Sequence, residues 1–529
     1  MMKITLSLLL FIWGWSLNAQ TAPNPFEAYT DPNEPTTFTN PIIPGFYSDP
    51  SVCRVGDDYY LITSTFEYFP GVPVFHSIDL INWEQIGHCI DRAEQLPNGI
   101  NIFAATIRYH KGTFYMITTN VVDGGNFYVT ATNPAGPWSM PIWIDIQGID
   151  PDLFFDTDGK TYVISSPFDL YEIDIASGKL LTEGKKIWAG TGGRYAEGPH
   201  IYKKDGYYYL MVAEGGTEEA HSETIARSNN IWGPYTENPA NPILAHANAA
   251  GQTSLIQGVG HADIIQAHDL SWWIVFHGYR KSIGYPTHHI LGRETCLAPV
   301  SWPKNGWPVV NGNGTVRVNM TCPTLPLKPM AATPERTDFN ETKLGMEWNF
   351  IQAPPRDHPF YEIAKGKLAL HGLAPKIGEN ESPAFIGRRL QDLKFIAKTS
   401  IDFDPKNENE EAGIILLNNK QHFDIIIKKS GTKRVLATRF TFGNLTYISK
   451  EYPLQPGAIT LIIKGEGEYF NFSFEQGNQL TEIDKVEVRY LSSETVGWFT
   501  GVYVGMYATG NGKQSQTPAL FDYFDYAAD

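Results

Sequence analysis

The sequence predicts an all-β protein, a five-bladed β-propeller followed by a β-sandwich of jelly-roll type. Tyrosine, phenylalanine, glycine and proline are abundant (27, 29, 48 and 36 of 529 residues). Short apolar runs alternate with turn residues, which is typical of many short antiparallel strands. A five-fold internal repeat occupies the first part of the chain and is absent from the second, so the two parts are predicted to have different architectures.

The repeat is a turn followed by a run of aromatic and aliphatic residues. Its five copies carry the equivalent aromatics Tyr60, Tyr115, Tyr162, Tyr209 and Trp273. These aromatics lie 47 to 64 residues apart, which suits one four-stranded propeller blade per copy. A short apolar run and a turn precede the copies, so each copy is expected to be the second strand of a hairpin.

The second part of the chain begins after a proline-dense stretch, 323–334. We place the propeller at 39–325, a linker at 326–336 and the sandwich at 337–529. The strand candidates of the sandwich have hairpin-like spacing and no propeller repeat. They are Phe385–Arg389, Ala412–Leu417, His422–Ile427, Thr460–Ile463, Tyr469–Phe474 and Tyr503–Tyr507. A short, proline-rich linker is stiff, so the sandwich is expected to pack on the propeller.

The N-terminus has the pattern of a signal peptide over residues 1–19, followed by a lead segment at 20–38. Lys3 provides the positive start, residues 4–17 are mostly apolar, and Ala19 is the small residue before the cleavage point. The apolar run is shorter than the roughly 20 residues that span a bilayer. The protein is therefore expected to be exported to the periplasm or secreted, and not to span the membrane.

The charge balance is acidic, with 57 Asp and Glu against 41 Lys and Arg, a formal net charge of −16. An acidic surface repels phosphate backbones, so nucleic acid is not an expected partner. It also repels polyanionic polysaccharides, and this favours a neutral substrate.

Four cysteines, Cys53, Cys89, Cys296 and Cys322, are too few for a disulfide scaffold in a chain of this length, and they form no CxxC pair. Buried thiols are the favoured interpretation. A Cys53–Cys89 bridge is the alternative, because export permits disulfides.

The repeat also brings candidate functional residues into register. Twelve residues before the reference aromatic, or eleven in the first copy, stand Asp49, Phe103, Asp150, Glu197 and His261. Equivalent positions at the start of each inner strand surround the propeller axis, so these five are expected at one mouth of the central channel. An aromatic face and several carboxyl groups are what a sugar-cleaving pocket needs.

A structural alternative exists for each acid taken alone. Asp-Pro and Glu-Gly pairs mark turns, and an acid there can simply cap a strand end. Three acids in register are harder to explain in this way. Crowded like charges are costly and are found mainly at functional sites.

The residues around these acids resemble glycoside hydrolase family 43. The segment 40–51, which contains Phe46-Tyr47-Ser48-Asp49-Pro50, resembles the opening motif of that family. Gly148–Phe154, Glu197–His200 and Gly260–Asp263 are similar to further motifs, and so is Leu291–Thr295. The similarity extends from about residue 40 to residue 320. Residues 338–349 resemble the start of the concanavalin-like sandwich of the β-xylosidase-like members.

The resemblance implies roles for individual residues. The acid matching Asp49 is the general base, and the acid matching Glu197 is the general acid. The acid matching Asp150 orients Glu197 and raises its pKa through its negative charge. Arg293 matches a substrate-contacting arginine, with an ion pair to Glu294 as the structural alternative. The resemblance also implies that a sandwich loop closes one side of the pocket, and the candidate is an aromatic in Phe499–Tyr507.

Phe103, Phe66 and His261 are further candidates for the pocket. Phe103 stands where the family often has tryptophan, and it still offers a flat apolar wall. Phe66 is expected to line the sugar pocket, with a place in the core as the alternative. His261 is a sugar contact, a core histidine or a ligand of a central ion through water. Some family members hold calcium, but one histidine without a carboxylate cage is weak evidence for it. A structural calcium near the axis therefore stays an option, no metal ligand is assigned and no cofactor is required.

The predicted function is an exo-acting, inverting glycoside hydrolase that releases xylose from the non-reducing ends of xylo-oligosaccharides, a β-1,4-xylosidase. An α-L-arabinofuranosidase, or an enzyme with both activities, is the alternative, because the two sugars present similar hydroxyl patterns. A non-catalytic carbohydrate-binding protein is a more remote one. A propeller scaffold for protein partners would not need the crowded acids. The expected partners are neutral, xylan-derived pentose oligosaccharides, and the oligomeric state is left open.

Overall fold

The computed structural model describes residues 38–248, 251–282, 284–321, 324, 327–330, 333–355, 359–379 and 381–529. The predicted signal peptide, the lead segment up to residue 37 and Cys322 lie outside the described residues. Within the described ranges, no helix has the length and apolar character needed to cross a membrane.

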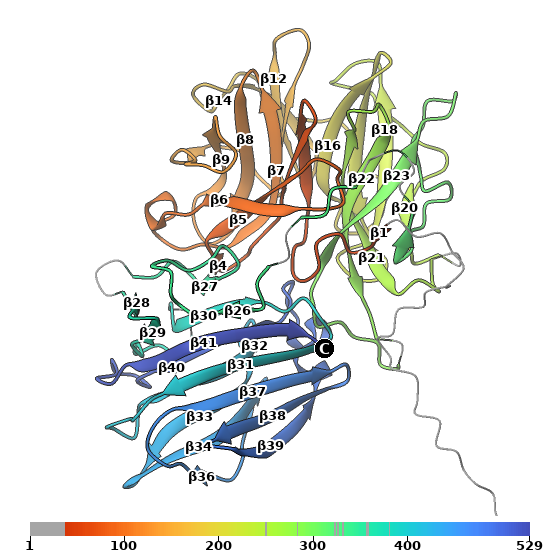
Figure 1. Ribbon diagram of the computed structural model, residues 1–529. Helices are drawn as coiled ribbons and strands as arrows, with labels where there is room; N and C mark the ends of the chain where they lie inside the picture. The colour runs from red at the N-terminus through yellow and green to blue at the C-terminus, as the bar shows by residue number, and fades with distance from the viewer. Residues whose placement is uncertain are drawn as a thin grey trace, which may run out of the picture.

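The first part of the chain forms five antiparallel sheets, and this confirms the predicted five-bladed propeller (Figure 1). Their strands are, blade by blade: β2 (Ser51–Val55), β3 (Asp58–Ile62), β5 (Gly71–Ser77) and β6 (Glu84–Ile90); β7 (Ile102–His110), β8 (Thr113–Asn120), β9 (Gly125–Ala131) and β10 (Ile142–Trp143); β11 (Asp152–Phe155), β12 (Thr161–Ser165), β13 (Asp169–Asp174), β14 (Lys179–Leu180) and β15 (Lys185–Lys186); β16 (Glu197–Lys204), β17 (Tyr207–Glu214), β18 (Ser222–Ser228), β19 (Thr236–Glu237) and β20 (Leu244–Ala245); β21 (Ile256–Gln266), β22 (Trp272–Arg280), β23 (Glu294–Ser301) and β24 (Val309–Val310).

The five sequence repeats are the second strands of the blades, β3, β8, β12, β17 and β22, as predicted. Each pairs with the inner strand of its own blade in an antiparallel hairpin. The reference aromatics Tyr162, Tyr209 and Trp273 are buried between blades. The repeat therefore marks the positions where neighbouring blades pack against each other.

The inner strands close into a ring around the axis. β2 contacts β7 and β21, β11 contacts β7 and β16, and β16 contacts β21. The N-terminal segment fastens the ring, because β1 (Phe38–Thr39) pairs with β25 (Asn319–Met320). Asn40 adds a two-way hydrogen bond to Leu297 of the fifth blade, at 2.9 and 2.8 Å. The first and fifth blades are thus held side by side.

The second part is a sandwich of two sheets, as predicted, and all six strand candidates are strands. One sheet contains β26 (Arg336–Thr337), β28 (Tyr361–Ala364), β29 (Lys367–Leu370), β31 (Lys394–Asp402), β37 (Ile459–Glu466), β38 (Tyr469–Gln476), β39 (Gln479–Glu487) and β41 (Ala519–Ala528); the other contains β30 (Ala384–Arg389), β32 (Glu411–Asn418), β33 (Gln421–Ser430), β34 (Lys433–Phe442), β35 (Leu445–Ile448), β36 (Tyr452–Pro453) and β40 (Tyr503–Thr509). Side chains of β31 alternate between buried and partly buried, with exposed residues at its two ends, because successive residues of a strand face opposite sides.

The sandwich packs directly on the propeller (Figure 1). β4 (Tyr68–Phe69), from the first blade, pairs with β27 (Phe350–Ile351) of the second part. The rings of Tyr68 and Tyr503 stack with centroids 3.8 Å apart, and Arg389 Nε donates to the Phe46 carbonyl at 2.6 Å. The prediction that the sandwich is docked is therefore confirmed.

Helical structure is confined to short segments in the part of the chain described: η1 (Ala93–Gln95), η2 (Val488–Leu491) and α1 (Ser493–Val496). The last two lie in the connection from β39 to β40, which reaches back to the propeller. Ser493 N–H there donates to the His289 carbonyl at 3.1 Å.

The described cysteines, Cys53, Cys89 and Cys296, are buried free thiols, so the Cys53–Cys89 bridge is wrong. Cys53 lies on β2 and Cys89 on β6, the inner and outer strands of one four-stranded blade. Three strand spacings of about 4.8 Å separate these strands. A disulfide needs Cα atoms within about 7 Å.

Candidate active site

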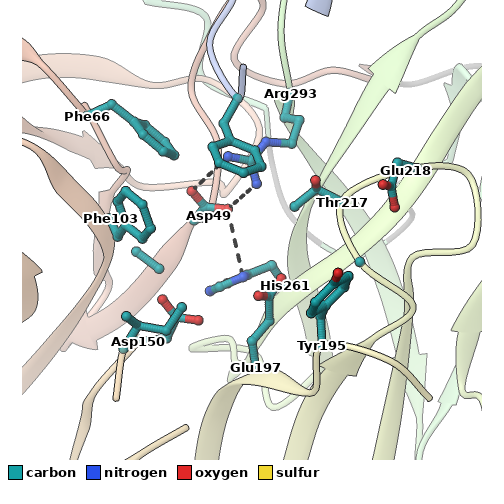
Figure 2. A pocket seen from close by; sticks show the side chains of 14 residues that line it. Asp49, Phe66, Phe103, Asp150, Tyr195, Glu197, Thr217, Glu218, His261 and Arg293 are labelled. Atoms are coloured by element: carbon teal, nitrogen blue, oxygen red, sulfur yellow. Dashed lines mark hydrogen bonds and ion pairs between the residues drawn. The ribbon is translucent and has the colours of Figure 1, made fainter. Parts of the chain in front are cut away.

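One mouth of the central channel holds a pocket of about 360 Å³ (Figure 2). Its lining includes all seven residues proposed from the sequence: Asp49, Phe66, Phe103, Asp150, Glu197, His261 and Arg293. The remaining lining residues are Ala104, Ile149, Tyr195, Gly216, Thr217, Glu218 and Phe499. The register of the repeat therefore located the five axial positions correctly.

The blades share an uncommon backbone conformation at these positions. Asp49, Asp150 and His261 have φ of 54°, 54° and 49°, and Gly198, directly after Glu197, has φ of 58°. This left-handed region is sparsely populated by residues other than glycine, and Asp and His are among the types that enter it most often. Such strain is concentrated at functional sites. Here it occurs at three of the five axial residues, all of which line the pocket.

Asp49 is buried and contacts four polar side chains. Arg293 Nη1 donates to Oδ1 at 2.7 Å, and His277 Nδ1 lies 3.0 Å from the same oxygen. The hydroxyls of Ser48 and Ser64 donate to Oδ2 at 2.9 and 2.5 Å. Burial alone would raise the pKa of Asp49, but the positive charge of Arg293 and the hydrogen bond with His277 hold it well below the usual value. Asp49 is therefore ionised near neutral pH.

The pairing of Arg293 with Asp49 shows that the Glu294 alternative is wrong. Glu294 instead accepts from Arg280, at 2.8 and 2.7 Å. Adjacent residues at the start of β23 point to opposite faces of the strand. Arg293 therefore faces the pocket while Glu294 faces the domain interface.

The pKa of Glu197 is shifted in the opposite direction to that of Asp49. Burial is the largest cause that raises its pKa, to about 7, and the negative charge of Asp49 raises it further, while Arg293 acts against both. The pKa of Asp150 is raised well above its usual value by burial and by the charges of Glu197 and Asp49. Below about pH 7, Asp49 is therefore ionised while Glu197 is mostly protonated.

The sequence predicted that the negative charge of Asp150 raises the pKa of Glu197. Burial is the largest cause of the raised pKa, followed by the negative charge of Asp49. Asp150 is itself buried, and its own pKa is raised by burial and by the like charges of Glu197 and Asp49. Asp150 and Glu197 therefore repel each other when both are ionised, and burial adds to this effect. Asp150 also contacts the segment that carries Glu197. Its Oδ2 accepts a hydrogen bond of 3.3 Å from the N–H of Gly198, and this contact positions the backbone beside Glu197.

Three phenylalanines form the apolar wall of the pocket. The Phe66 ring centroid lies 5.1 Å from that of Phe103 and 5.8 Å from that of Phe499. The Arg293 guanidinium lies 5.8 Å from both Phe66 and Phe499, so it closes the wall toward Asp49. Phe66 is only 3% exposed, so it belongs to the core and to the pocket wall at once.

Phe499 comes from the sandwich and not from the propeller. This confirms the prediction that an aromatic of Phe499–Tyr507 closes the pocket. The neighbouring Trp498 anchors the loop, because its Nε1 donates at 3.2 Å to Glu67, the residue after Phe66. The second domain therefore completes the site that the propeller begins.

Replacing Phe499 by alanine is expected to lower kcat/KM by roughly tenfold or more, because a sugar loses one wall of its pocket. Steady-state kinetics on a nitrophenyl pentoside measures the loss. Tyr447→Ala is the matched control, since Tyr447 is an exposed aromatic on β35 of the same domain, outside the lining of the pocket. An equal loss in both variants would show that domain stability, and not the pocket wall, is affected.

Several pocket features escaped sequence reasoning. His277 lies in β22, outside the register of the axial positions, yet it contacts Asp49. Tyr195, Thr217 and Glu218 belong to loops without periodic signal. Arg108 bridges two further acids. Its Nη2 lies 2.8 Å from an Asp152 carboxylate oxygen, and its Nη1 lies 2.7 Å from one of Asp263. The acids themselves were visible in the sequence, two residues after Asp150 and His261, but their common arginine was not.

Calcium near the propeller axis was an option from the sequence. His221, His277 and Glu223 carry buried polar atoms without a hydrogen-bond partner among the described residues. Calcium requires six to eight oxygen ligands, and this group offers one carboxylate among imidazoles. The described ranges contain no group of three or more His, Cys, Asp or Glu that could hold a metal. The residues do not fit a directly coordinated calcium, and the calcium option stays a prediction.

The family model described as glycosyl hydrolases family 43 matches residues 38–308, more than half of the chain. The chain belongs to glycoside hydrolase family 43. A second model, described as the β-xylosidase C-terminal concanavalin A-like domain, matches residues 336–527. The two matches coincide with the propeller and the sandwich.

Relatives of this family-43 enzyme cover almost its whole length. A non-reducing end α-L-arabinofuranosidase, BoGH43B of Bacteroides ovatus, is 42% identical over 99% of each chain. A xylosidase/arabinosidase of Butyrivibrio fibrisolvens is 38% identical, over 90% of this chain and 96% of its own. The crystal structure of a xylan β-1,4-xylosidase from Bacillus halodurans superposes with a TM-score of 0.86 at 32% identity, covering 92% of this chain and 99% of the other. The protein is thus a glycosidase by family.

Proposed function

We propose that this family-43 enzyme removes single pentose units from the non-reducing ends of neutral, xylan-derived oligosaccharides, as an inverting β-1,4-xylosidase. The observation that carries the proposal is the pair of opposite carboxyl states in one small pocket, with the pKa of Asp49 lowered and that of Glu197 raised to about 7. A pocket of about 360 Å³, closed on one side by Phe499, suits a terminal sugar better than the middle of a chain.

In the proposed mechanism, Asp49 takes a proton from water, and the water oxygen attacks the anomeric carbon. The bond to the leaving oxygen breaks as Glu197 protonates that oxygen. Arg293 and His277 orient the Asp49 carboxylate. Asp150 orients the motif that carries Glu197, through Gly198. Phe66, Phe103 and Phe499 hold the sugar ring and exclude water, while His261 faces the sugar from the axis.

Inversion is supported by the placement of the two carboxyls. An inverting site must leave room for a water, so its carboxyl groups stand about 6.5–9.5 Å apart. Asp49 precedes β2 and Glu197 begins β16, and the inner strand β21 contacts both β2 and β16 in the ring. The base and the acid therefore come from blades that another blade separates.

α-L-Arabinofuranosidase activity is the second candidate, and it is favoured by the 42% identity to the Bacteroides ovatus arabinofuranosidase. A purely carbohydrate-binding role gains no support, because binding alone does not need carboxyls in opposite protonation states. The predicted signal peptide, 1–19, supports a further part of the proposal, that the enzyme acts in the periplasm or outside the cell, where xylan fragments arrive.

The test compares nitrophenyl β-xyloside with nitrophenyl α-arabinofuranoside and follows xylobiose hydrolysis by proton NMR. The β-xyloside is expected to be the better substrate, and α-xylose is expected to appear first. β-Xylose as the first product would mean that one carboxyl acts as a nucleophile. Mixed oligomers from long xylan, with little monomer, would rule out exo action. A preference for the arabinoside would select the second candidate.

A further inference from the structure

The rim of the pocket on the side of Glu197 differs in character from its walls. Figure 2 shows Tyr195, Thr217 and Glu218 on that side, opposite Phe66 and Phe103. Tyr195 is 68% exposed, whereas Phe66 is 3% exposed. A large aromatic ring held at the open edge of a sugar pocket offers a surface to something beyond the first sugar.

The proposed mechanism indicates which part of the substrate lies at this rim. The general acid must reach the oxygen between the terminal sugar and the rest of the substrate. The rest of the substrate therefore leaves the pocket on the side of Glu197. Tyr195 is two residues before Glu197, on the same loop, so the departing part of the chain passes over its ring.

The loop that carries Tyr195 is fastened by a buried carboxylate. Glu214 is 2% exposed, and its Oε1 accepts from the backbone N–H groups of Thr191 and Gly193, at 2.8 and 3.2 Å. Its Oε2 accepts from the hydroxyls of Thr191 and Thr224, at 2.5 and 3.0 Å. An exposed ring on an anchored loop is preorganised, and this lowers the entropy lost on binding.

Arg194 joins this loop to the loop of Gly215 and Glu218 on the same side of the rim. Its Nε donates to the Gly215 carbonyl at 2.9 Å, its Nη2 pairs with Glu218, and its guanidinium lies 5.5 Å from the Tyr195 ring centroid. The ion pair places hydrogen-bonding groups of both signs beside an aromatic face. Sugar rings need this combination, because their C–H faces are apolar and their edges carry hydroxyls.

Gly216 allows the cluster to be this compact. A Cβ at Gly216 would lie 2.8 Å from Glu218 Oε2 and 3.2 Å from Tyr195 Cδ2. Its φ of 76° is also one that glycine adopts without strain. The backbone thus passes directly between the ring and the carboxylate, and it holds them at one edge of the pocket.

We propose that Tyr195, together with the Arg194–Glu218 pair, forms the binding site for the leaving-group sugar, a neutral pyranose ring adjoining the terminal pentose. The inference rests on the proposed function and adds to it the residues that select oligosaccharides over simple glycosides. The Tyr195 ring stacks on the C–H face of that sugar, and Arg194 and Glu218 bind its hydroxyls.

The test uses two substrates that share the terminal xylose and an alkyl-alcohol leaving group, xylobiose and methyl β-xyloside. Only xylobiose carries a second ring. Tyr195→Asn removes the aromatic ring and suits the left-handed backbone at this residue, where φ is 51°. The ratio of kcat/KM for xylobiose to that for methyl β-xyloside is expected to fall about tenfold, mainly through KM. Tyr195→Phe keeps the ring and is expected to retain most of the ratio.

Tyr285→Ala is the control, because Tyr285 is fully exposed and outside the lining of the pocket. An unchanged ratio in Tyr195→Asn, or an equal loss in Tyr195→Phe, would overturn the proposal. Failure of the proposed function has a different signature, since the wild-type enzyme would then hydrolyse neither xyloside. If the wild type prefers arabinosides, methyl α-arabinofuranoside and an arabinosyl-xylose disaccharide replace the two xylosides.

Discussion

Replacing Asp49 by asparagine is expected to lower kcat by about a thousandfold or more on every glycoside, in the upper part of the range for positioned proton transfer. Asparagine keeps the size of the side chain but cannot take a proton from water. Because the attacking water is needed whatever the leaving group, aryl and sugar glycosides lose activity alike. Steady-state rates on nitrophenyl β-xyloside and xylobiose measure the effect.

A loss of activity in Asp49→Asn must be distinguished from a loss of folding stability. Asp49→Asn leaves the buried Arg293 guanidinium without its carboxylate partner at 2.7 Å, and breaking a buried ion pair costs stability. A thermal melt and xylose binding by calorimetry therefore accompany the rates. Asp57→Asn is the matched control, an exposed aspartate in the turn before β3. An Asp49→Asn protein that is folded and still active on xylobiose would contradict the assignment of Asp49 as the base.

Replacing Glu197 by glutamine is expected to have the second-largest effect, and one that depends on the leaving group. Glutamine cannot protonate the departing oxygen. Xylobiose should lose roughly 10²–10⁴-fold in kcat, the range for general acid catalysis. Dinitrophenyl β-xyloside should lose least, because its leaving group departs as a stable anion. Equal losses on both substrates would mean that Glu197 acts other than as an acid.

The pH dependence follows from the same two carboxyls. Glu197 must be protonated to act, and its pKa is raised to about 7, so activity is expected to fall as the pH rises through about 7. Asp49 must be ionised, and its pKa lies well below the usual value, so the acidic limb appears only in strongly acid solution. In Glu197→Gln, the residual activity on the dinitrophenyl substrate should lose the basic limb. Glu237→Gln, an exposed glutamate on β19, should keep the wild-type profile.

A large part of the site could be predicted from the repeat. A propeller places equivalent residues of each blade around one axis, so a constant offset from the reference aromatics brought Asp49, Phe103, Asp150, Glu197 and His261 together. The repeat itself is visible because blade-to-blade packing demands an aromatic or aliphatic run at the same strand of each blade. Local backbone chemistry agrees with it, since Asp and His are tolerated in the left-handed conformation found at three of these positions.

Other features depend on contacts between segments distant in the sequence. Arg293 lies beside Glu294 along the chain, yet its partner is Asp49, 244 residues away, because strand pleating sends neighbouring side chains to opposite faces. Phe499 enters the pocket only because the sandwich docks on the propeller through β4 and β27. No periodicity within either domain specifies how the two are docked.

The sequence by itself determined the architecture, the family and the identity of the three acids, because each depends on a repeating pattern or a contiguous motif. Only the tertiary structure decided which of those acids has a lowered pKa and which have a raised one. Burial is the largest cause of the raised pKa of Glu197, and the charge of Asp49 adds to it. Burial is a property of all the chain that surrounds a group, and it cannot be assigned from the neighbours of that group in the sequence.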